Sequence, residues 1–178
     1  ATILARSLQT AAIHGSITNR DFLVRLLRHP EFLAGDIDTH FLDRHDPAAL
    51  GAPLLDEPAE RRAAVAAALA AQAANRSDAP VLASVPTGWR NVPSQPQRVT
   101  FTGRHGTFEI GYAFGRDGLT VDGYEWARLV EAAPERVSVE LDGVLGHYEI
   151  HRVGDVAYVD TPDGPAHLTE APRYPTTD

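Results

Sequence analysis

Apolar residues in the first part of the chain recur at the spacing of an amphipathic helix. In residues 16–32, SITNRDFLVRLLRHPEF, four of them share one helical face: Phe22, Leu23, Leu26 and Leu27. Thr18 and Asp21 have the spacing of a capping box, which predicts a helix that Thr18 caps and that Pro30 ends. A shorter helix is predicted over residues 38–44.

A longer helix follows and is built almost entirely from alanine. The sequence DEPAERRAAVAAALAAQAAN, residues 56–75, begins with Asp56 as a candidate N-cap and has Pro58 near its start. Its only large apolar residues, Val65 and Leu69, lie four positions apart on one face. Two interpretations remain open. Small residues on every face would let the helix pass through a narrow interior, or alanine is present only as the best helix former.

After residue 97 apolar and polar residues alternate, which is the period of a β-strand. The alternating apolar positions are Val99 and Phe101; Phe108, Ile110, Tyr112 and Phe114; Val137, Val139 and Leu141; and Val144, Tyr148 and Ile150. Turn sequences separate these runs, among them Asp117-Gly118, Asp142-Gly143 and Asp163-Gly164. The spacing predicts about eight short strands in an antiparallel barrel or sandwich.

Between the long helix and the strands lies a segment with neither period, VPTGWRNVPSQPQ, residues 85–97. It places Trp89 among prolines, a glycine and polar residues. A large apolar ring in such a segment needs a surface against which it can be buried. The residues alone leave open whether that surface belongs to this chain or to another.

Charge and composition exclude several classes of function. The 178 residues carry a formal net charge of −8, which argues against nucleic acids and anionic membranes as partners. Residues 77–178 hold eight arginines and 15 acidic residues, against eight and nine in residues 1–76, so the second part favours a basic protein surface over a polyanion. Cysteine, lysine and methionine are absent, which excludes disulfides, thiolate chemistry, Schiff bases and a lysine-linked biotin within this sequence.

No secretory signal is visible at the start of the sequence. The start, ATILARSLQT, lacks the basic and apolar regions of a secretory signal and resembles the middle of a helix. We therefore expect a cytoplasmic protein and a segment of a longer chain. No apolar run approaches the roughly 20 residues that span a bilayer.

Histidines near acidic residues are the first candidates for chemistry. His40 and His45 stand among aspartates, but five positions along a helix place them about 140° apart. This spacing favours solvated helix ends over a metal site. His147 and His151 share one face of a strand, and they are predicted to face solvent because the opposite face is apolar.

The remaining polar groups do not form a recognisable catalytic motif. Glu109 and Glu149 are predicted to lie on the solvent side of their strands. The sequence has no nucleophile elbow, phosphate loop or dinucleotide-binding fingerprint. The chain is therefore predicted to be non-catalytic, and a hydrolase would lack its nucleophile signal.

Residues 16–45, SITNRDFLVRLLRHPEFLAGDIDTHFLDRH, resemble the C-terminal end of the biotin carboxylase domain in α subunits of biotin-dependent acyl-CoA carboxylases. The Thr-Asn-x-x-Phe-Leu start, the Pro-x-Phe pair with the glycine after it, and the Asp-Thr-x-Phe-Leu close carry this resemblance. The GWRNVPSQPQ stretch and the order of a helix before strands resemble the next domain of propionyl-, methylcrotonyl- and long-chain-type carboxylases. That domain is called the BT domain because it mediates contact between the biotin carboxylase and carboxyltransferase components.

This resemblance implies an α+β fold, with an eight-stranded antiparallel β-barrel around a long central helix and short helices before it. It implies that residues 1–47 are the truncated end of the carboxylase domain and that residues 48–178 are the BT domain. The parts expected within the BT domain are a central helix at 56–76, an extended hook at 77–97 and the barrel at 98–171. Apolar side chains in the truncated part are expected to be exposed, for example Phe22, Leu26 and Phe41.

The resemblance also implies a function, that of a non-catalytic assembly domain in a biotin-dependent ligase of acyl-CoA metabolism. Trp89, Arg90, Asn91 and Val92 are the hook residues expected to contact the carboxyltransferase β subunit. The chain's own biotin carboxylase and biotin carboxyl carrier domains are the other expected partners. We expect this segment to bind no metal and no cofactor, while biotin and ATP with Mg²⁺ belong to the holoenzyme.

A free-standing β-barrel that binds a small ligand is the alternative function. Alternating aromatic residues would suit such a barrel. The position of the alanine-rich helix separates the two hypotheses, because a helix inside the barrel would take the place of the ligand.

Overall fold

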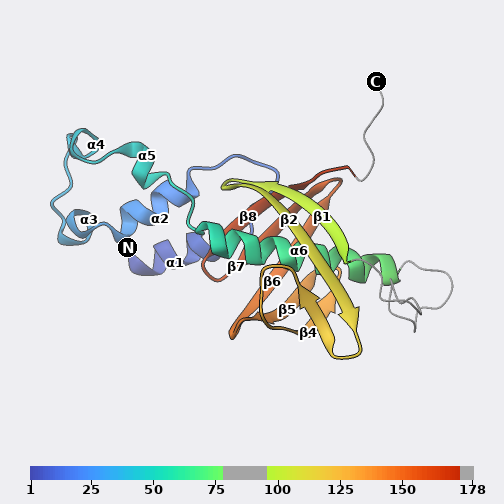
Figure 1. The fold of residues 1–178 in the computed structure, drawn as a ribbon. Helices are drawn as coiled ribbons and strands as arrows, with labels where there is room; N and C mark the ends of the chain where they lie inside the picture. Colours follow the sequence, from blue (N-terminus) through green and yellow to red (C-terminus); the bar gives the residue numbers. More distant parts are fainter. Residues whose placement is uncertain (78–95, 173–178) are drawn as a thin grey trace, which may run out of the picture.

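The computed structural model describes residues 1–77 and 96–172, and it confirms the predicted α+β architecture (Figure 1). Short helices come first: α1 (Thr2–Thr10), α2 (Arg20–Arg28), α3 (Pro30–Ala34), α4 (Phe41–Arg44) and α5 (Pro47–Leu50). The long helix α6 (Glu57–Ser77) follows. The strands are β1 (Gln97–Gly103), β2 (Gly106–Gly115), β3 (Gly118–Val121), β4 (Ala127–Ala133), β5 (Arg136–Leu141), β6 (Val144–Val153), β7 (Val156–Thr161) and β8 (Gly164–Glu170). None of the helices within the described ranges is both long and apolar enough to cross a membrane.

The eight strands form one antiparallel sheet in the order β3-β2-β1-β8-β7-β6-β5-β4. Hairpins connect consecutive strands from β1 to β3 and again from β4 to β8. β1 and β8 pair only through Phe101 with Glu170 and Thr102 with Thr169. The strands at the two ends of this order, β3 and β4, lie next to each other without forming a ladder. The sheet therefore curls into a nearly closed barrel.

The long helix α6 lies inside this barrel. Every residue from Ala63 to Ala70 is at most 1% exposed, and α6 contacts strands around the sheet from β2 through β1 and β8 to β4. This confirms that the alanine-rich helix passes through a narrow interior. Alanine suits the position because each side chain adds only a methyl group, so strands can approach from every direction. Larger strand residues such as Phe101 and Ile110 fill the remaining volume.

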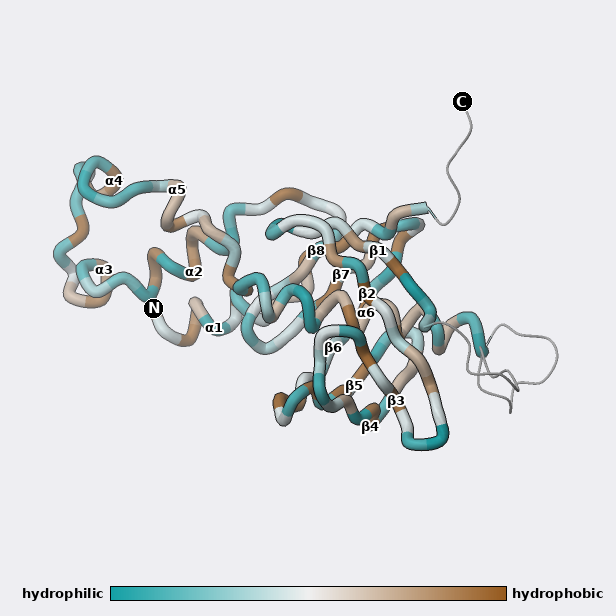
Figure 2. The backbone as a smooth tube through the Cα atoms, viewed as in Figure 1, coloured by the Kyte–Doolittle hydropathy of each residue, from teal (hydrophilic) through white to brown (hydrophobic). Residues whose placement is uncertain are grey.

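The strands carry the predicted alternation of apolar and polar positions (Figure 2). On β2, Phe108, Ile110 and Tyr112 are at most 4% exposed, and the residues at the β2–β3 hairpin turn are polar. The β5–β6 turn has positive φ angles at both Asp142 (49°) and Gly143 (83°). This conformation gives the twist that a two-residue hairpin needs, and it accounts for the Asp-Gly sequence.

The start of α2 corrects one prediction. α2 begins at Arg20 with Asn19 as its N-cap, and no side chain caps it, so the capping box at Thr18 and Asp21 is wrong. Thr18 Oγ1 instead lies 3.4 Å from the backbone N of Arg20. The predicted end is confirmed, because α2 stops at Arg28 and Pro30 begins α3.

The structure corrects three further predictions, two on burial and one on the length of a helix. Phe41 is 3% exposed rather than solvent-exposed, because the rings of His29 and His45 lie 5.0 and 4.5 Å from it, whereas Phe22 and Leu26 are half-buried. The helix around Phe41 is also shorter than predicted, since α4 covers only Phe41–Arg44. Val144 is 50% exposed although it alternates with buried residues, because it lies at the tip of the β5–β6 hairpin.

Candidate functional site

The two ends of α6 face different parts of the molecule. Figure 1 shows the short helices α1 to α5 gathered on one side of the barrel, while the C-terminal end of α6 emerges on the other side. α6 has 21 residues, and at 1.5 Å per residue it is about 31 Å long. The helix therefore keeps the short helices and the far end of the barrel a fixed distance apart.

The connection from α6 to β1 begins and ends at the far end of the barrel. The β1–β2 turn is bonded to Glu60, near the start of α6, so β1 ends beside the start of the helix. β1 must then begin beside the other end, where Ser77 closes α6. The predicted hook residues Trp89, Arg90, Asn91 and Val92 belong to this connection and lie outside the described residues.

Glu60 fixes α6 in the barrel. Its side chain is 3% exposed, and it accepts hydrogen bonds from the backbone N–H of Arg104 at 2.9 Å and of His105 at 2.8 Å. His105 Nδ1 lies 2.7 Å from the same carboxylate. The sequence marks Glu60 only as an acidic residue in the first turn of a helix. Its role was not predictable because the partners come from a distant turn.

Polar contacts attach the short helices to the outside of the barrel. His14 Nε2 lies 2.8 Å from Asp160 Oδ2, and the His14 ring stacks on His151 and Tyr158 with centroid distances of 5.0 and 4.9 Å. Arg25 donates to the carbonyl oxygens of Ala52 and Pro53, in the segment that leads into α6, at 3.3 and 2.7 Å. His151 is exposed, as predicted, but its ring also stacks on the ring of His14, between α1 and α2.

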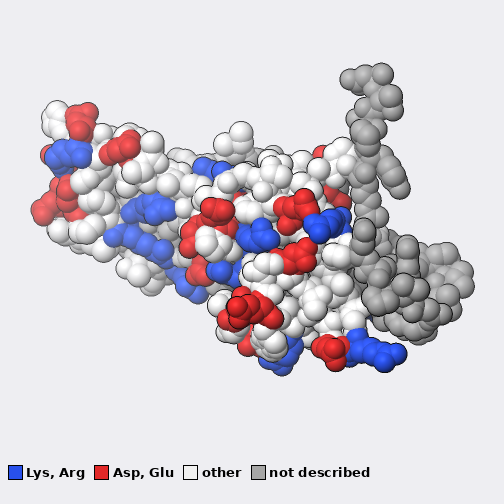
Figure 3. Space-filling model, in the orientation of Figure 1, with Lys and Arg blue, Asp and Glu red and all other residues white. Residues whose placement is uncertain are grey.

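A cavity of about 770 Å³ lies between the short helices and the start of α6. Figure 3 shows basic side chains gathered over the helical part of this face, and Arg25, Arg28 and Arg62 line the cavity. Asp46, Asp56 and Asp163 line it as well. The guanidinium of Arg28 is held by Gln9, and that of Arg25 by backbone carbonyls. The cavity is lined by charges of both signs, and its residues Arg25 and Arg28 already donate hydrogen bonds within the chain. We therefore interpret it as a gap between packed elements rather than a binding site.

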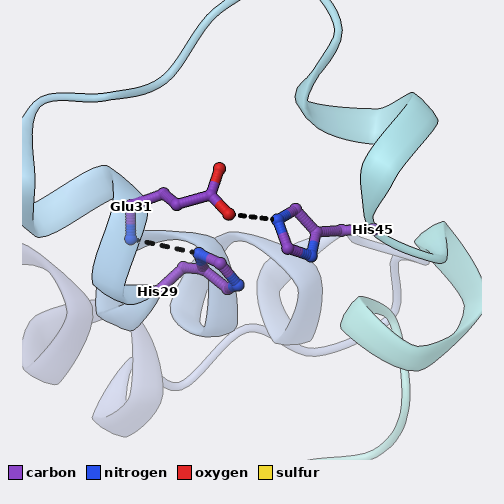
Figure 4. A group of neighbouring side chains, drawn as sticks. All are labelled: His29, Glu31 and His45. Carbon is purple, nitrogen blue, oxygen red and sulfur yellow. Dashed lines mark hydrogen bonds and ion pairs between the residues drawn. The ribbon is translucent and has the colours of Figure 1, made fainter.

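His29, Glu31 and His45 form the only group of three histidine or acidic residues within the described ranges whose potential ligand atoms all lie close together, within 4.8 Å (Figure 4). His45 Nε2 lies 2.7 Å from Glu31 Oε1, and Arg44 donates to Glu31 Oε2 at 3.0 Å. The Glu31 N–H donates to His29 Nδ1 at 3.3 Å. Hydrogen bonds from Arg44 and His45 lower the pKa of Glu31. A metal ion would have to replace these bonds, so we interpret the cluster as a network that joins α3 to α4.

This cluster differs from the pair that the sequence suggested. His40 lies 3.0 Å from Asp43 and takes no part in the cluster, whereas His45 packs against Phe41 and Glu31. His45 does lie at a helix end, as the C-cap of α4, but its side chain is only 27% exposed because it packs against Phe41 and Glu31. The sequence did not indicate His29 as part of a cluster, because His45 comes close to it only when α4 folds back beside α3.

Surface groups on the barrel pair with one another across strands. Glu109 binds Arg98, and Glu149 accepts from Arg136 at 2.9 Å, so both carboxylates lie on the solvent side as predicted. Ser138 Oγ lies 2.9 Å from His147 Nδ1, which is a contact between directly paired residues of β5 and β6. Ser138 is 5% exposed, so its hydroxyl is closed to a substrate. The Ser–His pair therefore does not make a hydrolase site.

Comparison with protein families gives one match. Residues 60–173 match the family model described as methylcrotonyl-CoA carboxylase, alpha-subunit, BT domain. The matched range covers more than half of the chain, from the buried start of α6 to just beyond β8. The short helices α1 to α5 all lie before the matched range. A search among curated proteins found no match.

Proposed function

Because the chain belongs to the family of BT domains of methylcrotonyl-CoA carboxylase alpha subunits, we propose that it docks a biotin carboxylase component onto a carboxyltransferase β subunit. The family implies a non-catalytic assembly role within a biotin-dependent carboxylase. The observation that carries the proposal is the buried helix α6, which runs through the barrel from the side of the short helices to Ser77 at the other end. A rigid connection of this kind suits a domain whose role is to hold two enzyme components in a fixed arrangement.

The docking element of the proposal is the hook, with Trp89, Arg90, Asn91 and Val92 as its contact residues. Tryptophan and arginine are frequent anchors of protein interfaces. The acidic balance of residues 77–178 favours a basic surface on the partner.

The short helices are the second attachment of the proposal. Residues 1–47 resemble the end of a biotin carboxylase domain, and polar contacts hold them to β7 of the barrel and to the segment before α6. The enzyme would then carry both active sites in one assembly, so that biotin moves between them at a high effective concentration. ATP, Mg²⁺ and biotin act elsewhere in that holoenzyme, and loss of docking should abolish overall carboxylation while ATP-dependent carboxylation of biotin continues.

Binding of this chain to the carboxyltransferase β subunit tests the proposal. We expect the two to co-migrate in size-exclusion chromatography and Trp89→Ala to weaken binding by about 2 kcal/mol or more, roughly 30-fold. Trp126→Ala is the matched control, because Trp126 is the other tryptophan of the chain and is 47% exposed on the barrel. Its affinity should stay within about threefold of the native chain.

Two results would contradict the docking role. One is that the folded native chain does not bind the β subunit. The other is that Trp89→Ala binds as tightly as the native chain while Trp126→Ala does not. In the second case the docking surface would lie on the barrel around β4.

The alternative, a small-ligand barrel, loses its binding place in this fold. The residues of α6 from Ala63 to Ala70 occupy the interior where such a ligand would lie. The cavities of about 770 and 310 Å³ are both lined by residues of the short helices or of the segment around them, rather than by the barrel interior alone.

A further inference from the structure

A second cavity, of about 310 Å³, lies on the outside of the barrel at the start of α2. It shares no residue with the larger cavity beside α6. Polar side chains from residues 15–21 and from the barrel line it, among them Thr18, Arg20, Asp21, Arg104, Tyr158 and His167. The cavity therefore brings together the start of α2, the β1–β2 turn and the outer face of β7 and β8.

Arg20 is a buried cation in the wall of this cavity. It is 4% exposed, and its Nη1 donates to the carbonyl oxygen of Ala11. Its Nε is buried and has no hydrogen-bond partner. Among the described residues, no carboxylate oxygen lies within 4.0 Å of its guanidinium. A buried charge without a counter-charge is strongly unfavourable, so an anion bound beside Arg20 would stabilise it.

Arg104 supplies a second positive charge from the barrel side. Its side chain is 57% exposed, and its nearest carboxylate is Asp21 at 3.7 Å, beyond hydrogen-bond distance. Arg104 can therefore turn toward a ligand without breaking a close ion pair. Two guanidinium groups face one carboxylate, which leaves the cavity with a local excess of positive charge in a chain of net charge −8.

The other walls offer polar groups without adding negative charge. Burial lowers the pKa of His167, as do the nearby charges of Arg20 and His14, although Asp160 and Asp21 act in the opposite direction. His167 is therefore neutral at pH 7 and can donate or accept a hydrogen bond. The start of α2 lines the cavity through Thr18, Arg20 and Asp21, so the positive end of the helix dipole lies beside it.

We propose that this cavity binds a small molecule through a phosphate-type oxyanion, with Arg20 and Arg104 as its cationic groups. A tetrahedral oxyanion offers acceptors in several directions, which suits guanidinium groups on two sides and hydroxyl donors between them. A carboxylate is the weaker candidate, because its two oxygens offer acceptors in one plane only, whereas the cationic groups stand on two sides of the cavity. The inference does not depend on the assembly function.

Titration with inorganic phosphate, followed by NMR of the whole 178-residue chain at constant ionic strength, tests the proposal. We expect saturable shift changes confined to residues 15–21, to Arg104 and to His167, with a shift of the Arg20 side-chain N–H resonance. Phenyl phosphate distinguishes the source of the oxyanion. Tighter binding than phosphate indicates an organic phosphate that extends along Tyr158, and equal binding indicates free phosphate.

Variants separate a specific site from general attraction. Arg104→Ala should weaken phosphate binding about tenfold. Arg136→Ala is the matched control, because its side chain is also 57% exposed and lies on the barrel, and it should leave binding unchanged. Arg20→Lys keeps the charge but loses the planar guanidinium, so a folded Arg20→Lys variant should also bind more weakly.

Two outcomes would overturn the proposal. One is the absence of saturable shifts up to about 50 mM of either phosphate compound, far above the millimolar range expected of a weak specific site. The other is equal loss of binding in Arg104→Ala and Arg136→Ala, which would show attraction to arginines in general.

Discussion

At the residue scale, Glu60 shows how one carboxylate can fix a helix inside a barrel. It is nearly fully buried and it satisfies two backbone N–H groups of the β1–β2 turn. Gly103 leaves room for it, since a Cβ at that position would stand 2.7 Å from Glu60 Oε1. The carboxylate therefore sets how far and in which rotation α6 enters the barrel.

Glu60→Ala is expected to lower the free energy of unfolding by about 2–4 kcal/mol, because it removes the charged acceptor of two backbone N–H groups and the contact with the His105 ring. Urea unfolding followed by circular dichroism measures this. Glu57→Ala is the control, since Glu57 lies in the same helical turn but is exposed, and it should change stability by less than about 0.5 kcal/mol. Equal effects of the two substitutions would show that Glu60 acts only through helix propensity.

At the element scale, the volume of the α6 side chains decides whether the barrel can close. Residues from Ala63 to Ala70 are buried on every side of the helix, and only Val65 and Leu69 among them exceed alanine in size. A helix with larger side chains would hold the strands apart and break the β1–β8 pairing, which rests on two residue pairs. The alanine content is therefore a packing requirement as well as a helix preference.

Ala67→Leu is expected to destabilise the chain by about 1–3 kcal/mol through overpacking. Leucine and alanine are both good helix formers, so helix propensity contributes little to the difference. Ala74→Leu, near the end of α6 where burial is only partial, should cost less than about 1 kcal/mol. Thermal unfolding of the two variants provides the comparison, and equal destabilisation would contradict a tightly filled interior.

At the scale of the whole molecule, the apolar core belongs to α6 and the barrel. Its buried cluster runs from Leu55 to Leu168 and includes no residue of α1 to α5. The short helices attach instead through polar contacts, among them His14 with Asp160 and Arg25 with the carbonyls before α6. This division agrees with the predicted domain boundary at residue 47, which stays a prediction.

A chain of residues 48–178 is therefore expected to fold on its own. It should lose only about 1–3 kcal/mol of unfolding free energy, because the deleted contacts are a partly exposed ion pair and a few hydrogen bonds. Urea unfolding and the dispersion of NMR amide signals would measure this. A shortened chain that is unfolded in buffer would place the helical segment within the folding core.

The sequence was sufficient to predict the long helix, the strands and the hairpin turns, because the signals for these elements are local. Period-two alternation marked the strands, Asp-Gly pairs marked hairpin turns, and Asp56 was correctly predicted as the N-cap of α6, where it accepts from the Ala59 N–H at 2.8 Å. The start of α2 was not predicted correctly. There Asn19 rather than Thr18 is the N-cap, and the Arg20 side chain that follows it is buried by contacts from outside the helix, which the local pattern does not contain.

By itself the sequence determined that this protein has a narrow alanine helix, a set of amphipathic hairpins and no catalytic motif, because period, side-chain volume and residue type are properties of neighbouring positions. Only the tertiary structure decided that the helix lies inside the barrel, that Glu60 binds the β1–β2 turn, that His29 joins His45, and that Arg20 is buried beside Arg104. Each of these depends on contacts between residues far apart in the chain, and such contacts form only when the barrel closes around α6.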